Sequence, residues 1–99
     1  MVIGQSHEMD DGRIIFAACD KELLGQIIED KERGICLVIN REFFGDKEIQ
    51  ASEFVEMLTI SSTAFLVGEE TISLATKNGF ISEGIEKVRG IPYVMYIRW

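Results

Sequence analysis

The stretch Arg13-Ile14-Ile15-Phe16-Ala17-Ala18-Cys19-Asp20 decides the fold class that the sequence predicts. Its apolar run is too short for most helices and is rich in residues that favour strands. Upstream, Asp10-Asp11-Gly12 is a turn signal, because Gly accepts a positive φ and Asp tolerates one. Together with residues 1–8, the run predicts an antiparallel hairpin whose second strand is central in a sheet.

A short helical turn is expected directly after this strand. Asp20 stands where a helix N-cap would stand, so its carboxylate is predicted to accept N–H groups of the turn formed by residues 21–24. Gly25 then ends the turn, most simply in the left-handed conformation.

A second hairpin is predicted from residues 26–30 and 35–40, which flank a polar linker that ends in Gly34. The run from Ile35 to Ile39 has no polar face, so we expect other elements to cover it on both sides or end-on.

Two helices are predicted in the second half of the chain. Ser52 can cap the first, in which Phe54, Val55, Met57 and Leu58 form an apolar stripe. Residues 59–63 lower helix propensity and predict a bend or break. A second helix is expected over residues 64–78, with Gly68 allowing close packing against the sheet; it ends at Gly79 in the left-handed conformation, with Phe80 folded back.

Residues 85–89 and 93–99 are predicted to be two further strands, with Gly90 and Pro92 between them. Strands first, two helices next and strands last predict an α+β fold. The expected architecture is a two-layer sandwich: a mainly antiparallel sheet of about five to six strands with two helices on one face.

Length and composition indicate one soluble domain over residues 1–99, since a chain of this size buries one core and 46% of its residues are hydrophobic. It offers neither an apolar run long enough to span a bilayer nor a signal sequence, so a cytoplasmic location is expected. A net charge of −7, with acidic residues interleaved among the basic ones, disfavours direct nucleic-acid binding without excluding it.

Candidate catalytic groups are few. Cys19 and Cys36 lie in apolar stretches and are expected to be reduced and buried, although a helix start beside Cys19 would favour a reactive thiolate. His7 lies near Glu8, Asp10 and Asp11, which fits either a metal site or an exposed acidic hairpin tip. We assign no catalytic residue, no metal site and no cofactor.

Aromatic residues outside the predicted helices form a candidate contact surface: Phe43, Phe44, Tyr93, Tyr96 and Trp99. Phe43 and Phe44, in a loop ended by Gly45, are either core residues or an exposed anchor for a partner. The C-terminal strand is a candidate sheet edge, which predicts a protein partner or a homo-oligomer through that strand.

Short motifs in this order resemble the archaeal domain of unknown function 424 family from about Ile14 to Pro92. They run from Cys19 to Gly25, through Phe43-Phe44-Gly45 and Leu66 to Glu69, to Gly90-Ile91-Pro92. Many relatives carry a histidine after the proline, where this chain has Tyr93, which weakens any histidine-dependent reaction there. The resemblance implies a cytosolic protein of this size in a translation or RNA-handling context, with no assigned substrate.

Two hypotheses follow. The first is a non-enzymatic binding module that acts through a protein partner, because catalytic groups are sparse and aromatic contact residues are many. The alternative is a small enzyme with a cleft around Cys19, Asp20 and Glu69. The hypotheses differ in whether the motif residues converge on one pocket: Cys19, Asp20, Gly25, Gly68, Glu69, Gly90 and Pro92.

Overall fold

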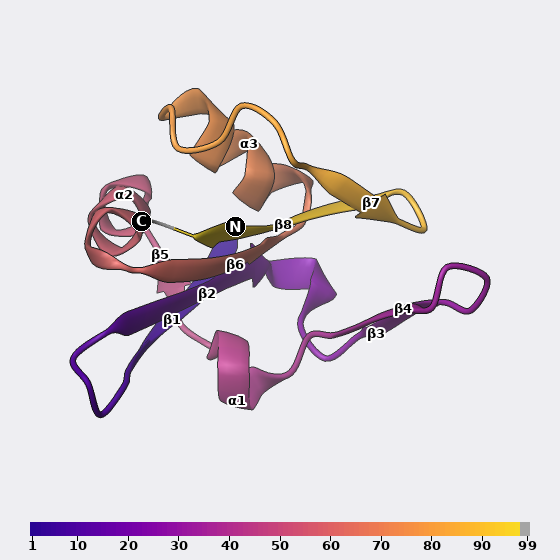
Figure 1. Cartoon of the computed structure of the whole chain (residues 1–99), viewed down its shortest axis with the longest axis horizontal. Coiled ribbons are helices and arrows are strands. Elements are labelled where there is room, and N and C mark those ends of the chain that lie inside the picture. The colour runs from indigo at the N-terminus through magenta and orange to yellow at the C-terminus, as the bar shows by residue number, and fades with distance from the viewer. Residues whose placement is uncertain (98–99) are drawn as a thin grey trace.

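The main sheet has six strands in the order β5-β1-β2-β6-β8-β7 in the computed structural model, which describes residues 1–97 (Figure 1). Its strands are β1 (Val2–Glu8), β2 (Ile14–Asp20), β5 (Glu48–Ile49), β6 (Thr63–Val67), β7 (Glu86–Val88) and β8 (Ile91–Ile97). β2 and β6 pair in parallel, and the other neighbours pair antiparallel. The α+β class and the mainly antiparallel sheet are therefore confirmed.

The hairpin of β1 and β2 is confirmed, and β2 lies at the centre of the sheet between β1 and β6. Phe16, Ala17, Ala18 and Cys19 are all fully buried, so the centre of β2 is covered on both faces. This explains why the strand reads as a continuous apolar run instead of an alternating one.

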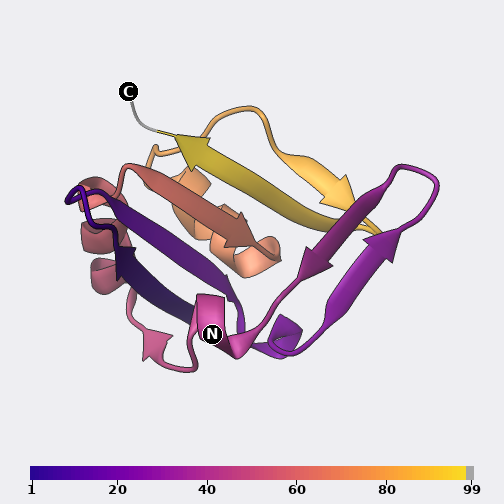
Figure 2. The ribbon, with the colours of Figure 1, turned by 60° about the horizontal axis from the view of Figure 1, so that its bottom comes forward.

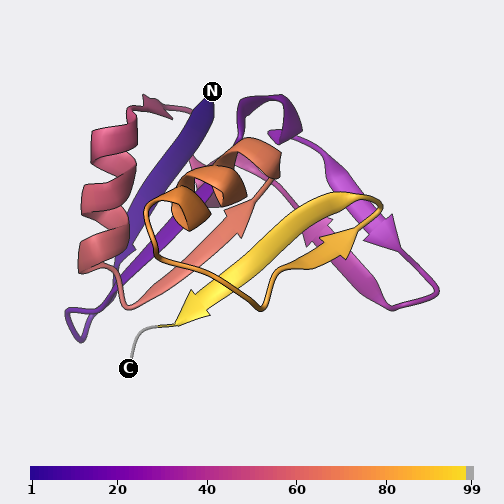
Figure 3. The same ribbon diagram turned by 90° about the horizontal axis from the view of Figure 1, so that it is seen from above.

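Two helices, α2 (Ala51–Ile60) and α3 (Glu69–Lys77), lie on one face of the sheet (Figures 1 and 3). Phe54 and Leu58 of α2 and Ile72 and Ala75 of α3 pack against sheet residues such as Phe16 in one apolar core. The predicted pair of helices on one face is thus confirmed.

The opposite face carries a smaller layer, formed by the two-stranded sheet of β3 (Ile27–Asp30) and β4 (Ile35–Val38) and by the short helix α1 (Arg41–Phe44) (Figure 2). The predicted second hairpin is confirmed by the antiparallel pairing of β3 and β4. The loop predicted over residues 41–46 is instead largely helical, because the Asn40 side chain accepts a hydrogen bond from the N–H of Phe43 at 2.8 Å.

The prediction of full cover over Ile35 to Ile39 is wrong. Ile35 and Leu37 turn toward the main sheet and are half-buried, whereas Cys36 and Val38 face outward and are exposed. Alternation along an extended strand causes this difference, and an apolar run gives no sign of which positions face out.

The helix predicted over residues 64–78 is also wrong at its start. Residues 64–67 lie in β6, and α3 begins only after Gly68, whose φ of 110° a helix cannot contain. The Ala-Phe-Leu-Val segment is apolar enough to serve in either element, and its place beside β2 decides the outcome.

The ends of α2 agree in part with the sequence. Gln50, two residues before the predicted cap Ser52, is the N-cap, and the Glu53 carboxylate accepts a hydrogen bond from the N–H of Gln50. The helix ends at Ile60, within the region where a break was predicted.

The end of α3 is as predicted. Gly79 has a φ of 79° and donates its N–H to the carbonyl of Thr76, while the N–H of Phe80 bonds back to the carbonyl of Ala75. This pair of hydrogen bonds is a Schellman motif, which requires a left-handed residue at Gly79.

We expect Gly79→Val to lower the free energy of unfolding by about 1 kcal/mol or more, because a β-branched residue is strained at positive φ. No heavy atom lies within 4 Å of the Cβ that a substitution would add, so the loss reports backbone strain alone. Gly79→Asn is the matched control and should lose less, since Asn tolerates the left-handed region. Urea unfolding measures both, and equal losses would contradict the assignment.

Candidate functional site

The carboxylate of Asp20 caps α3 from a neighbouring strand. Its Oδ1 accepts hydrogen bonds from the N–H and the hydroxyl of Thr71, each at 2.8 Å, and its Oδ2 accepts one from the N–H of Glu70 at 3.1 Å. Asp20 is only 4% exposed and its side chain does not cap the 3₁₀ turn Lys21–Leu23. The predicted cap of the turn over residues 21–24 is therefore wrong, because the Asp20 carboxylate caps α3 instead.

Gly68 makes this cap possible. It occupies the N-cap position of α3 and supplies no side chain, and a Cβ there would lie 2.3 Å from Cγ of Asp20. The N–H of Gly68 also donates to the carbonyl of Pro92 at 2.8 Å. The close approach that the sequence predicted for Gly68 is an approach to a carboxylate.

The motif residues thus meet only in part. Asp20, Gly68 and Pro92 come together at the end of the sheet where β2 and β6 finish, with Cys19 beside them on β2. Gly25 and Gly90 lie at separate turns with φ of 90° and 81°. Glu69 is exposed at the start of α3.

Cys19 is unsuited to nucleophilic chemistry. Burial, followed by the negative charges of Asp20 and Glu22, raises the pKa of its thiol to about 12. The thiol is therefore protonated at neutral pH. The carboxylate of Asp20 is already occupied by the α3 cap.

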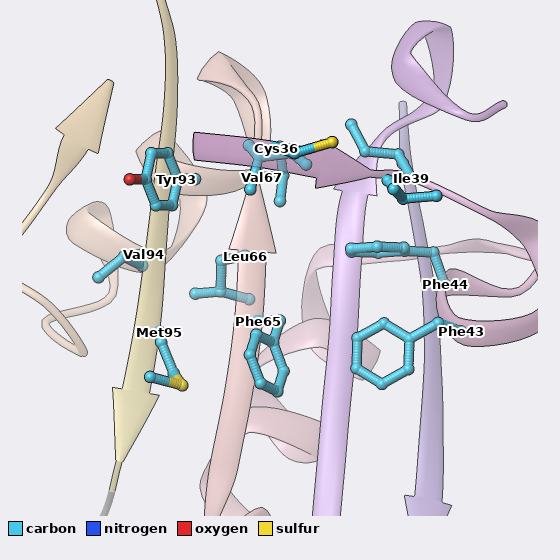
Figure 4. Close-up of a pocket in the computed structure, with 12 residues that line it drawn as sticks. Cys36, Ile39, Phe43, Phe44, Phe65, Leu66, Val67, Tyr93, Val94 and Met95 are labelled. Carbon is cyan, nitrogen blue, oxygen red and sulfur yellow. The ribbon is translucent and has the colours of Figure 1, made fainter. Parts of the chain in front are cut away.

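An apolar groove of about 290 Å³ lies on the other face of the sheet (Figure 4). Its floor is formed by β6 and β8, β4 crosses one end, and α1 forms a side wall. We call it the β4 groove, and its lining residues are Cys36, Leu37, Val38, Ile39, Phe43, Phe44, Phe65, Leu66, Val67, Tyr93, Val94 and Met95.

The aromatic wall of the β4 groove is held in place by β1. His7 lies parallel to Phe43, with ring centroids 5.2 Å apart, and its Nε2 lies 2.8 Å from the Phe43 carbonyl oxygen. Because a carbonyl oxygen only accepts, Nε2 carries the proton in this contact. Phe43 in turn meets the ring of Phe65 edge-on at 5.3 Å, which joins the wall to the floor.

The β3–β4 hairpin is fixed at both ends. At its base the N–H of Gly25 donates to the carbonyl of Ile39 at 2.7 Å. At its tip Arg33 donates to the carbonyl of Lys87 at 2.5 Å. The hairpin is therefore held over the main sheet with one side toward the β4 groove.

The five aromatic candidates are in different environments. Phe43 and Tyr93 are half-buried in the β4 groove, whereas Phe44 is buried in the core beneath it. Tyr96 faces the helices and packs edge-on against Phe80, and Trp99 lies outside the described residues. The sequence does not single out Phe65, because it predicts a helix over residues 64–78, and it does not single out Met95, which is not aromatic.

Within residues 1–97, no group of three or more His, Cys, Asp and Glu side chains is placed to hold a metal ion. None of the helices in that part of the chain is both long and apolar enough to cross a lipid bilayer.

We expect a thiol-reactive disulfide reagent to label Cys36 rapidly in the native protein and Cys19 only after denaturation, because Cys36 is exposed and Cys19 is buried. The stoichiometry of labelling at pH 8, with and without urea, measures this difference. Cys36→Ser is the control and should leave no fast-reacting thiol. Rapid labelling of that variant would contradict the burial of Cys19.

We expect Asp20→Ala to cost about 2 kcal/mol or more of stability, because buried donors at the start of α3 lose their acceptor. Asp20→Asn keeps an acceptor oxygen and should cost less. Gly68→Ala should also destabilise the protein, but less so in the Asp20→Ala background, where the carboxylate no longer meets the new Cβ. Chemical unfolding of the two single variants and the double variant measures the coupling, and additive losses would exclude the proposed contact.

Comparison with known proteins supports the architecture and names a family. The family model described as protein of unknown function (DUF424) matches residues 7–99. The crystal structure of an uncharacterized conserved protein from Methanopyrus kandleri is similar with a TM-score of 0.74 at 23% sequence identity, over 97% of this chain and 91% of that one. No curated protein matches. The chain belongs to the DUF424 family.

Proposed function

We propose that this protein is a non-enzymatic binding module and that the β4 groove binds an apolar segment of a protein partner. The observation that carries the proposal is an apolar concavity on a sheet face that the small layer covers only in part. Its lining is almost wholly apolar, which suits side-chain burial better than bond-making chemistry.

Exposed apolar side chains continue from the β4 groove onto the surrounding surface. Met95 on its floor is 54% exposed, and Val38 on its β4 side is 51% exposed. Ile97, the next residue of β8 on the same face as Met95, is also exposed. Contiguous apolar surface of this kind is typical of interaction sites, and it includes part of the C-terminal strand.

The alternative, a small enzyme, has less support. The thiol of Cys19 is buried and protonated, and Asp20 is engaged with α3. Glu69 is exposed at the start of α3, whereas Cys19 and Asp20 are buried.

The charge of the chain favours a basic partner. A net charge of −7 repels nucleic acid and a second copy of this chain, whereas it attracts a segment flanked by lysine or arginine. Self-association through β8 is thus the less favoured outcome. We place the protein in the cytoplasm, and a partner from translation or RNA handling remains the expectation that the family resemblance suggests.

Selection from a display library of linear peptides tests the proposal. We expect enriched peptides to carry apolar residues, and we expect Met95→Glu to weaken their binding about tenfold or more, since a carboxylate would have to be desolvated on the groove floor. Fluorescence anisotropy with the tightest selected peptide measures the affinity.

Ile60→Glu is the matched control. Ile60 is 55% exposed and Met95 is 54% exposed, but Ile60 lies on α2, on the opposite face of the sheet. This variant should bind the peptide as the parent protein does. An absence of enriched peptides, or equal affinities for the Met95→Glu and parent proteins, would overturn the proposal.

A further inference from the structure

Resting on the proposed function, we propose that the partner segment binds as an extended strand, pairs with the free edge of β4 and extends the β3–β4 sheet to three strands. The inference concerns how the backbone is recognised, whereas the proposed function concerns only where apolar side chains are buried.

The hydrogen bonds at the base of the hairpin show which side of β4 is free. Both the N–H and the C=O of Ile39 bond toward the β3 side, to Gln26 and Gly25. Alternation along an antiparallel strand then turns the N–H and C=O of Leu37 toward β3, and those of Cys36 and Val38 away from it. Within residues 1–97, β4 pairs with β3 alone.

The free side of β4 faces the β4 groove. Residues 36–39 all line the groove, and no residue of β3 does. A strand added beside β4 would therefore lie across the groove floor, with alternate side chains directed toward Phe65 and Met95. In Figure 4, β4 crosses above the floor strands, with Cys36 on it and these two residues below.

The partly open edge of β8, which also lies beside the groove floor, does not meet this condition. β7 pairs with β8 from Ile91 to Tyr93, so in the part of the chain that the structure describes no strand lies beside Met95 and Ile97 on the outer side of β8. That side borders a different hollow, which is lined by residues 80–84. A strand added there would not lie over the groove floor.

The chemistry of the site specifies its occupant. Unpaired N–H and C=O groups at alternate positions match an extended backbone, and an apolar floor selects apolar side chains at every second position. The free edge carries no charge, proline or bulge that would block pairing. Like charge on two copies favours a foreign segment with basic flanks over a second copy of this chain.

Hydrogen exchange by NMR, with the tightest selected peptide as the probe, tests the pairing. In the saturated complex we expect the amides of Cys36 and Val38 to exchange at least about tenfold more slowly than in the free protein. The exchange rates of the Met95 and Ile97 amides should stay unchanged. Binding that Met95→Glu weakens, without protection at Cys36 and Val38, would overturn the pairing and leave the proposed function standing. Protection at Met95 and Ile97 instead would overturn it in favour of the β8 edge.

A matched pair of proline variants provides a second measurement. Val38 and Ile27 face each other across the hairpin, and each directs its N–H away from the other strand. Val38→Pro should weaken peptide binding about tenfold, because it removes a donor on the groove side. Ile27→Pro removes the equivalent donor on the far edge and should bind normally. Circular dichroism checks that both variants fold.

Each remaining outcome either counts against the proposal or leaves the decision to hydrogen exchange. Equal peptide affinities for two folded proline variants would exclude pairing along β4. If Val38→Pro fails to fold, the exchange rates at Cys36 and Val38 decide alone. Dimerisation without peptide, lost in a folded Val38→Pro variant, would identify a second copy as the occupant. If no peptide is enriched, the pairing and the proposed function both fail.

Discussion

The fold depends on one carboxylate that caps the start of a helix far from it in the sequence. Asp20 ends β2, and its oxygens accept the hydrogen bonds that Glu70 and Thr71 donate, in place of the acceptor that an N-cap side chain at position 68 would provide. A negative charge is also favourable there, because the N-terminus of a helix carries partial positive charge. Through Gly68 the same contact reaches Pro92, so β2, β6, α3 and β8 all meet at this point.

The two faces of the sheet are consequently unequal. The face under α2 and α3 is filled by one continuous core, and the Asp20 contact sets the start of α3 over it. Among residues 1–97, the opposite face is covered by a hairpin and the four residues of α1, which leave part of β6 and β8 uncovered. The β4 groove lies where this face of the sheet is uncovered, and the contact between His7 and Phe43 positions its aromatic wall.

Local chemistry made part of this structure predictable. Gly79 and Gly25 mark their turns because each takes a positive φ, and the turn signals at Asp10-Asp11-Gly12 and Gly34 place two hairpins correctly. What could not be predicted depends on distant partners. Nothing near Asp20 shows that it bonds to Thr71, and nothing in the run from Ile35 to Ile39 shows which side chains face outward. Phe65 and Met95 lie together on the groove floor because β6 pairs with β2 and β8, and the sequence does not show this pairing.

The separation of Asp20 from its helix bears on how the chain folds. Asp20 and Thr71 are 51 positions apart, and the parallel pairing of β2 with β6 spans a similar distance. Closing so long a loop costs entropy before any contact repays it, so such contacts form late and slow the search. The β3–β4 hairpin, α1 and α2 all lie inside that loop, and their own backbone hydrogen bonds join residues that are close in the sequence. They can assemble first and shorten the effective loop, which would give the least covered part of the molecule an early role in guiding β6 to β2.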